Sequence, residues 1–315
     1  MTYLIGVDCG GTHIVGQTWT TSPEHLVQSV TGGPGNVVLD YTGAIANLTG
    51  VLDQLVAPIP ADQVGLILIG IAGIETAGHA DEIQQLVNQR YQIKTRVISD
   101  AKLALLNGLA GADGLLVIAG TGSVVYGRQT GHFLRVGGWG YVLGDEGSAY
   151  DITKRAFKQI LTRTDAGQTS QLTKPLLAQL DASSVPAAVQ RFYAQNRQTN
   201  AQLAQLIASL ADQGNSEAIA VLVASAQALA QQVITLYQRF ETPRPQNIVL
   251  SGSVLQHNQL VRAALTTAFI RSYQRLNSTI LQLIMPTLPF IGIVGLRRKI
   301  INDNASIRII NLSRS

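Results

Sequence analysis

Two carboxylates in this 315-residue chain each stand where an apolar, strand-like run ends. Asp8 follows residues 3–7 and precedes the turn Gly10–Thr12, and Asp100 follows residues 94–98. A carboxylate beside a glycine turn offers an oxygen ligand for Mg²⁺, and the turn offers free N–H groups for phosphate oxygens. A second carboxylate can accept the proton of an attacking hydroxyl. These residue types therefore point to phosphoryl transfer.

Small-residue turns follow three of the predicted strands, at Gly10–Thr12, Gly120–Ser123 and Ser251–Ser253. Gly120–Ser123 opens residues 119–150, the stretch that is richest in glycine, which also holds the adjacent carboxylates Asp145 and Glu146. Glycine lets backbone N–H groups approach a ligand closely. Short glycine motifs also occur in ordinary β-hairpins, so a plain turn is the alternative at each position. For Asp100 the alternative is a helix N-cap.

Hydrophobic patterning predicts strands and helices that alternate along the chain. A linker at 110–114 separates two stretches, each of which begins with a strand, a glycine turn and a second strand. We therefore expect an α/β fold with a duplicated β-hairpin core, and a mostly helical segment at 150–240. The expected strands are 3–7, 14–20, 64–71, 94–98, 115–119, 124–128, 247–250 and 279–284, and the other helices 40–57, 81–91, 101–110, 257–275 and about 290–301.

The composition limits the classes of function. The net charge of +4 is not gathered into a dense Lys/Arg block, which argues against a nucleic-acid partner. Cys9 is the single cysteine, so a disulfide within the chain is excluded and a reducing compartment is indicated. No secretory signal pattern opens the sequence, and no apolar run approaches the roughly 20 residues of a membrane span. A cytoplasmic protein that is not membrane-bound is expected.

The motifs also occur in an order that is found in one family. The chain resembles the N-acetylglucosamine kinase-like branch of the BadF/BadG/BcrA/BcrD-type ATPases, within the actin-like ATPase and sugar kinase superfamily. This resemblance implies two ribonuclease-H-like domains around a central cleft. Residues 1–112 with a C-terminal helix of about 289–315 would form one domain, and residues 113–288 a larger one with a helical insertion. The resemblance is carried by Asp8–Thr12, Gly35-Asn36, Asp100-Ala101, Gly120–Ser123, Gly137–Gly140 and Leu143–Tyr150.

What the resemblance implies is an ATP-dependent kinase that phosphorylates the 6-hydroxyl of an amino sugar, with ATP and Mg²⁺ as cofactors. Asp8 would lie near Mg²⁺, and Asp100 would bind the sugar and act as the base at its hydroxyl. ATP would contact Gly10, Gly11, Thr12, Thr121, Gly122, Gly252 and Gln256. The sugar would contact Asn36, Ser123, Gly138, Trp139, Gly140 and Asp145.

Several alternatives stay open at this point. N-acetylglucosamine leads among the sugars, followed by glucosamine and N-acetylmuramic acid. A non-catalytic ATP- or sugar-binding regulator on the same fold is a second possibility, against which the pair Asp8 and Asp100 argues. An activator of a radical enzyme would need several thiolates for an iron–sulfur cluster, and Cys9 is alone. A homodimer is implied by the resemblance only, and His13 and Glu146 are given no role.

Overall fold

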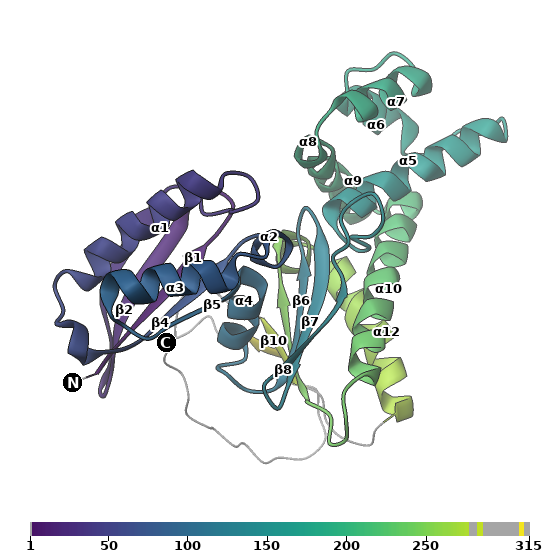
Figure 1. The fold of residues 1–315 in the computed structure, drawn as a ribbon. Coiled ribbons are helices and arrows are strands. Elements are labelled where there is room, and N and C mark those ends of the chain that lie inside the picture. Colours follow the sequence, from purple (N-terminus) through teal and green to yellow (C-terminus); the bar gives the residue numbers. More distant parts are fainter. Residues whose placement is uncertain (1, 277–281, 286–308, 312–315) are drawn as a thin grey trace. The chain divides into compact units, whose positions relative to one another are not determined.

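Two mixed β-sheets organise the chain in the computed structural model, which describes residues 2–276, 282–285 and 309–311 (Figure 1). The contacts divide these residues into two units, with the boundary between Ala112 and Asp113. The expected C-terminal helix within 289–315 lies outside the described residues. Of that stretch only β11 (Ile309–Asn311) is described, and it pairs with β10 (Gln282–Met285) in the second sheet.

The sheet of the first unit has the order β3-β2-β1-β4-β5. The strands are β1 (Tyr3–Cys9), β2 (Ile14–Thr21), β3 (Glu24–Gly32), β4 (Val64–Ile71) and β5 (Thr95–Ser99). β1 is antiparallel to β2 but parallel to β4, and β4 is parallel to β5. The register sets Cys9 beside Ile71 and Ile71 beside Ser99. The carboxyl ends of β1, β4 and β5 therefore lie in one row.

Helices cover both faces of this sheet. α1 (Tyr41–Val56) and α3 (Ala80–Tyr91) share one hydrophobic core with β1 and β4. They lie side by side in Figure 1. The Tyr91 hydroxyl of α3 donates to Asp53 of α1 at 2.7 Å. α4 (Asp100–Gly108) packs on the other face. A Cβ on Gly70 of β4 would come within 2.6 Å of the Leu103 Cβ, so glycine lets α4 approach the strand closely.

The second sheet repeats the first, with the order β11-β10-β9-β6-β7-β8. β6 (Gly114–Ala119), β7 (Ser123–Gln129) and β8 (His132–Gly137) form an antiparallel meander, and β9 (Asn247–Ser251) runs parallel to β6. β6 thus corresponds to β1, and β9 to β4. This confirms the predicted α/β fold with a duplicated hairpin core.

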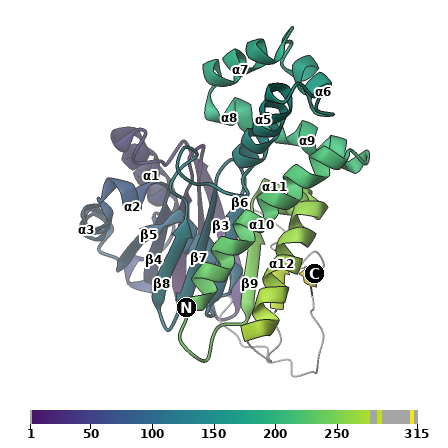
Figure 2. The same ribbon diagram turned by 90° about the vertical axis from the view of Figure 1, so that its right-hand side faces the viewer.

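The helices of the second unit form two groups. α10 (Ser216–Gln238) and α12 (Gln259–Leu276) lie side by side against the sheet in Figure 2. α5 (Ala149–Asp165), α6 (Thr173–Gln179), α7 (Val185–Ala194), α8 (Arg197–Gln202) and α9 (Ala204–Asp212) gather near one end of α10 (Figure 1). Among the described helices, α10 alone is long and apolar enough to cross a membrane. Its buried residues belong to the core of this unit, as expected of a core helix.

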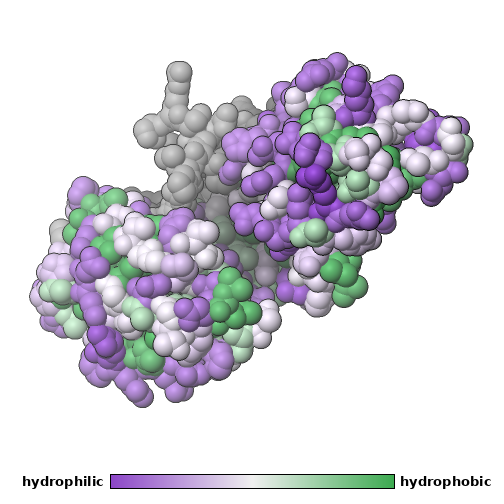
Figure 3. Space-filling view, turned by 90° about the horizontal axis from the view of Figure 1, so that it is seen from above, coloured by the Kyte–Doolittle hydropathy of each residue, from purple (hydrophilic) through white to green (hydrophobic). Residues whose placement is uncertain are grey.

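The surface face drawn in Figure 3 is largely hydrophilic, with hydrophobic residues in small groups. Several large apolar side chains in the described chain are nevertheless exposed, and two short segments hold most of them. Val38 and Leu39 form one, and Trp139, Val142 and Leu143 belong to the other. Both segments adjoin residues that the sequence assigns to sugar binding.

The sequence-based prediction missed β8 and β11, and it also missed β3. Its nine residues, EHLVQSVTG, are mostly polar and largely exposed because β3 is the edge of the sheet. An edge strand with a solvated face lacks the apolar run by which the central strands were recognised.

Candidate active site

Asp8 is the second-last residue of β1, and the register pairs it with Gly70 of β4. Paired residues of parallel strands point to the same face, so Asp8 shares the face on which α4 packs. The pKa of Asp8 is raised to about 6, chiefly by burial and further by the charge of Asp100, while His13 opposes the rise. Asp8 is therefore a desolvated carboxylate, whose ionised form a cation would stabilise.

The turn that follows Asp8 presents backbone N–H groups. Gly10 donates its N–H to the His13 carbonyl at 3.1 Å, which closes the turn. Within the described residues, the N–H groups of Gly11 and Thr12 have no hydrogen-bond partner. A Cβ at Gly11 would meet nothing within 4 Å. The internal packing therefore does not require glycine at 11, which leaves open space beside two free donors.

Asp100 is the first residue of α4, and Ser99 is the N-cap. The Ser99 hydroxyl accepts the Lys102 N–H at 3.3 Å, while the Asp100 carboxylate accepts the Ala101 N–H at 2.8 Å and its own backbone N–H. The alternative that Asp100 is the N-cap is therefore wrong. Burial raises the pKa of the Asp100 carboxyl, helped by the charge of Glu75 and opposed by the Ala101 N–H.

Asn36 lies in the loop between β3 and α1 and is half-buried. Its side-chain oxygen accepts the N–H groups of Val38 at 2.9 Å and Leu39 at 3.3 Å. This Asx-type turn engages the oxygen, so the amide NH₂ is the group that could reach a ligand. Gly73, with φ +79°, borders the loop, since its Cβ would come within 3.0 Å of the Asn36 oxygen.

In the second unit, the turn Gly120–Ser123 joins β6 to β7 as Gly10–Thr12 joins β1 to β2. Gly120 donates to the Gly122 carbonyl at 2.9 Å, and the Ala149 N–H donates to the Gly120 carbonyl at 2.8 Å. The Ser123 hydroxyl is buried and donates to the Glu146 carbonyl at 2.7 Å. Thr121 is exposed at the tip. Ser123 thus holds the following loop, and Thr121 is the side chain available to a ligand.

The segment Gly137–Gly140 needs glycine for its backbone. Gly137, Gly138 and Gly140 have φ values of +74°, +69° and +88°, a region that other residues avoid. Trp139 between them is 70% exposed, and the Arg135 guanidinium lies 4.4 Å from the centre of its ring. The loop therefore presents a large aromatic face that its own unit does not bury.

Asp145 is only 3% exposed and has the left-handed φ of +62°. Its carboxylate accepts backbone N–H groups of Ser123 and Gly140 and the Arg197 guanidinium, whose Nη2 lies 2.7 Å from Oδ2. Burial raises its pKa, and Arg197 and the two N–H groups oppose that rise. Arg197 comes from α8, in the helical segment where the sequence showed no motif. Only its proximity in the fold reveals it.

Two other side chains brace this loop. Glu146 accepts the Gln232 side-chain N–H of α10 at 2.5 Å. Asp151, near the start of α5, accepts the Gly147 N–H at 3.0 Å and the Ser225 hydroxyl at 3.0 Å. Ser148 caps the same helix by accepting the Asp151 N–H at 3.1 Å, so cap and carboxylate hold each other's segment in the manner of a capping box. The Glu146 side chain therefore holds the loop against α10 through its hydrogen bond with Gln232.

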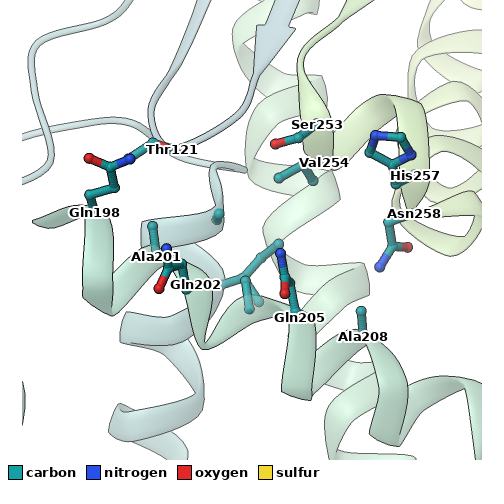
Figure 4. Close-up of a pocket in the computed structure, with 13 residues that line it drawn as sticks. Thr121, Gln198, Ala201, Gln202, Gln205, Ala208, Ser253, Val254, His257 and Asn258 are labelled. Carbon is teal, nitrogen blue, oxygen red and sulfur yellow. The ribbon is translucent and has the colours of Figure 1, made fainter. Parts of the chain in front are cut away.

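A pocket of about 240 Å³ lies beside the Gly120–Ser123 turn, within the second unit. In Figure 4, Thr121 and Gln198 lie at one end, His257 and Asn258 at the other, and Gln205 between them. None of the described residues that line it is an Asp, Glu, Lys or Arg, which suits a neutral, flat group with polar edges. The lining consists of Thr121, Ala149, Ile152, Gln198, Ala201, Gln202, Ala204, Gln205, Ala208, Ser253, Val254, His257 and Asn258.

Of the predicted adenosine contacts, Gly252 joins β9 to α11 (Ser253–His257), and Gln256 lies in α11, which forms one wall of this pocket. They are not themselves among its lining residues. Gly252 has φ +92°, and a Cβ there would overlap the backbone of Ala119. Gly252 thus lets the segment lie directly against the end of β6.

The repeated sheet and the glycine turns after β1 and β6 define a two-domain α/β protein of the actin-like ATPase class, with ribonuclease-H-like domains. The chain belongs to the BadF/BadG/BcrA/BcrD ATPase family, whose sequence profile matches residues 5–287. The solved structures agree with this fold. A proposed N-acetylglucosamine kinase from Chromobacterium violaceum superposes with a TM-score of 0.66 at 24% identity, over 86% of this chain and 93% of that one. A ROK family glucokinase from Streptomyces griseus, bound to glucose and AMPPNP, has a TM-score of 0.50 at 16% identity, over 90% and 94%.

Characterised relatives are similar over shorter lengths. An N-acetylmuramic acid/N-acetylglucosamine kinase of Clostridium acetobutylicum is 34% identical over 173 residues, which are 52% of this chain and 55% of that kinase. An N-acetyl-D-glucosamine kinase of Dictyostelium discoideum is 27% identical over 67% of this chain and 69% of its own. The match thus spans little more than half of the Clostridium relative.

Proposed function

We propose that this protein is an ATP-dependent kinase that phosphorylates the 6-hydroxyl of an amino sugar, with N-acetylglucosamine as the first candidate. The observation that carries the proposal is Asp100, a desolvated carboxylate at a strand end that is not the N-cap of its helix. The names of the relatives support the choice of sugar, since they are kinases of N-acetylglucosamine and N-acetylmuramic acid.

In the proposed reaction, Asp100 is the base. Its ionised carboxylate accepts the proton of the sugar 6-hydroxyl while the sugar oxygen forms a bond to the γ-phosphorus of ATP. The bond between that phosphorus and the β–γ bridging oxygen breaks, and ADP leaves. A raised pKa makes Asp100 a stronger base, although less of it is ionised at low pH.

ATP would be held by the two glycine turns. The free N–H groups of Gly11 and Thr12 suit phosphate oxygens, and Thr121 adds a hydroxyl at the second turn. The pocket beside Thr121, with its amide-lined edge, would take the base and ribose. Here the proposal departs in detail from the sequence-based assignment, since Gly252 would shape the pocket wall and Gln256 would lie outside the lining.

Mg²⁺ would be held near Asp8. Within the described residues, no three His, Cys, Asp or Glu side chains form a metal-binding group. That agrees with the usual mode of Mg²⁺, which takes one or two carboxylates and completes its shell with water and phosphate oxygens. The pKa of Asp8 is raised because the carboxylate is buried, and the charge of His13 offsets that rise only in part. When bound, the metal would neutralise charge on the transferring phosphate.

The sugar would be bound by the Asn36 amide, by the Gly138–Gly140 segment with Trp139, and by Asp145. Asn36 and Asp145 are both held in place by backbone N–H groups, as expected of preorganised ligands. An activator with an iron–sulfur cluster is disfavoured because Cys9 is buried, and burial raises the pKa of its thiol well above the usual value.

A cytoplasmic homodimer is part of the proposal, and chromatography with light scattering would test the dimer.

The test is a panel of sugars assayed with Mg²⁺ and ATP for ADP release. We expect turnover with N-acetylglucosamine, and lower activity with glucosamine or N-acetylmuramic acid, because one substituent in a pocket typically changes selectivity by only about 10- to 200-fold. Product analysis should show the phosphate on the 6-oxygen. Absence of turnover with every amino sugar would contradict the proposed function.

A further inference from the structure

Arg197, the first residue of α8, makes contacts that no motif in the helical segment 150–240 predicts. Its Nη2 is 2.7 Å from Oδ2 of Asp145, and its guanidinium lies 5.5 Å from the centre of the Tyr141 ring. The side chain is 38% exposed, whereas that of Asp145 is 4% exposed. One end of the ion pair is thus buried in the loop, and the other is supplied by the first turn of α8.

The pair also rests on the Gly120–Ser123 turn. A Cβ on Gly122 would overlap Arg197 Nη2 and would come within 2.8 Å of Asp145 Oδ2. Glycine at 122, whose φ is not left-handed, therefore leaves the room that this ion pair occupies. The candidate phosphate turn, Arg197 and the candidate sugar ligand Asp145 therefore lie directly beside one another.

One nitrogen of the guanidinium group makes no hydrogen bond. Arg197 Nε is buried and has no partner among the described residues. Buried polar groups of structural ion pairs are normally satisfied, and an exception needs a functional explanation. The next residue, Gln198, lines the pocket at Thr121, so one turn of α8 contacts both the sugar loop and the candidate nucleotide pocket.

We propose that Arg197 is a positioning residue that holds the Asp145 carboxylate ionised and oriented for the sugar. This inference rests on the proposed function. Asp145 accepts N–H groups from Ser123 and Gly140, but its burial opposes ionisation, and Arg197 supplies the compensating cation. Loss of Arg197 would leave a buried carboxylate without its charge partner, which is a much larger disturbance than loss of a surface pair.

The charges around Asp145 are few. Glu146 of its own loop opposes ionisation, and Arg197 of α8 favours it. On α5, Asp151 is paired with Arg155 at 2.7 Å and has Lys154 at 3.9 Å, so its charge is already compensated. Arg197 is therefore the cation that sets the protonation state of Asp145.

The test compares wild-type protein with Arg197→Ala, Arg197→Lys and Arg191→Ala. Arg191 of α7 pairs at 3.3 Å with Asp181, which is 95% exposed, and so serves as a matched arginine at an exposed ion pair. At pH 7.5 we expect Arg197→Ala to raise the sugar KM about tenfold or more, with kcat at saturating sugar changed less than about threefold. Arg197→Lys should restore most of the affinity, and Arg191→Ala should match wild type.

The pH dependence separates positioning from general damage. Without Arg197, the pKa of Asp145 rises further, so the increase in sugar KM as the pH falls should begin at a higher pH in Arg197→Ala than in wild type. The inference is overturned if Arg197→Ala keeps the wild-type KM profile. It is equally overturned if kcat, the ATP KM and the sugar KM all worsen together at every pH.

A readout without substrate keeps this inference distinct from the proposed function. The deficit in Tm of Arg197→Ala relative to wild type should grow from pH 5 to pH 8, because ionised Asp145 then lacks its partner. In an Asp145→Asn background, the effect of Arg197→Ala should no longer depend on pH. If wild-type protein binds no amino sugar, the proposed function fails, and the Tm series still decides whether Arg197 controls Asp145.

Discussion

Ser99 accepts the N–H of Lys102 at 3.3 Å and so caps α4, while Asp100 occupies the first position of that helix. A serine at the cap satisfies a helix N–H that a carboxylate would otherwise take. The Asp100 carboxylate is thereby left at the carboxyl end of β5 with a raised pKa. Cap and candidate base are adjacent residues with separable duties.

Asp100→Asn should reduce kcat about 10²-fold or more and leave ATP binding nearly unchanged, because an amide cannot accept the proton. In wild type, kcat should fall on the acid side with a pKa above the ordinary 3.8, and the residual activity of the variant should lack this limb. Steady-state kinetics from pH 5 to pH 9 and calorimetric titration with ATP provide the measurement.

Ser99→Ala is the control for this variant. Loss of the cap should cost about 1 kcal/mol of stability and change kcat far less than Asp100→Asn does. If Asp100→Asn weakened ATP binding with kcat unchanged, Asp100 would be a structural residue and the proposed base would be wrong.

Asp8→Asn should stabilise the protein in the absence of metal and nucleotide at pH 8. The folded pKa of about 6 lies above the ordinary value of 3.8, so Asp8 favours the folded state fully below pH 3.8 and loses that contribution as pH rises through 6. The ionised carboxylate thus costs up to about 3 kcal/mol above pH 6. Thermal unfolding with EDTA at pH 4, 6 and 8 measures it.

In this series, the gain in Tm from Asp8→Asn should be largest at pH 8 and vanish near pH 4. The same variant should lose Mg²⁺-dependent turnover, which would show that the destabilising charge is retained for the metal. A gain in Tm that is equal at all three pH values would contradict the pKa assignment.

Gly11→Ala should raise the ATP KM by about tenfold or more without a loss of stability. The methyl group would meet no atom of the chain within 4 Å, so the fold tolerates it, but it would enter the space where a phosphate must approach the free N–H groups. Nucleotide titration and thermal unfolding together test the two halves of this prediction.

Gly50→Ala is the matched control, since a Cβ at Gly50 in α1 also meets nothing within 4 Å. Alanine in a helix interior is favoured over glycine by about 0.5–1 kcal/mol, so Gly50→Ala should raise Tm slightly and leave the ATP KM unchanged. An unaltered ATP KM in Gly11→Ala would remove this turn from the proposed phosphate site.

Ala208→Leu should weaken ATP binding about tenfold or more by filling part of the pocket of about 240 Å³ beside Thr121. Ser209→Leu places the same side chain at the next position of α9, which is exposed and does not line the pocket. It should leave ATP binding unchanged. Equal ATP affinity in both variants, measured by titration, would show that the nucleotide does not use this pocket.

Much of the fold could be predicted from the sequence because its central strands are buried on both faces. Runs such as Val64–Ile71 and Gly114–Ala119 are continuously apolar, and each glycine turn marks a strand end. β3 could not be predicted in this way, since its exposed edge position permits polar residues. Local signals, a strand end and a glycine turn, singled out Asp8 and Asp100, whereas Asp145 was assigned to the sugar through the family resemblance.

The sequence by itself determined the order of the elements, the doubled strand–turn–strand pattern and the carboxylates beside glycine, because these are properties of neighbouring residues. The tertiary structure decided which residues that are far apart in the sequence come into contact. It set Arg197 against Asp145 across 52 positions, and Gln232 against Glu146 across 86. It also made Ser99, and not Asp100, the N-cap of α4. Such contacts depend on how helices pack, and helix packing is specified by shape and burial that no single segment carries.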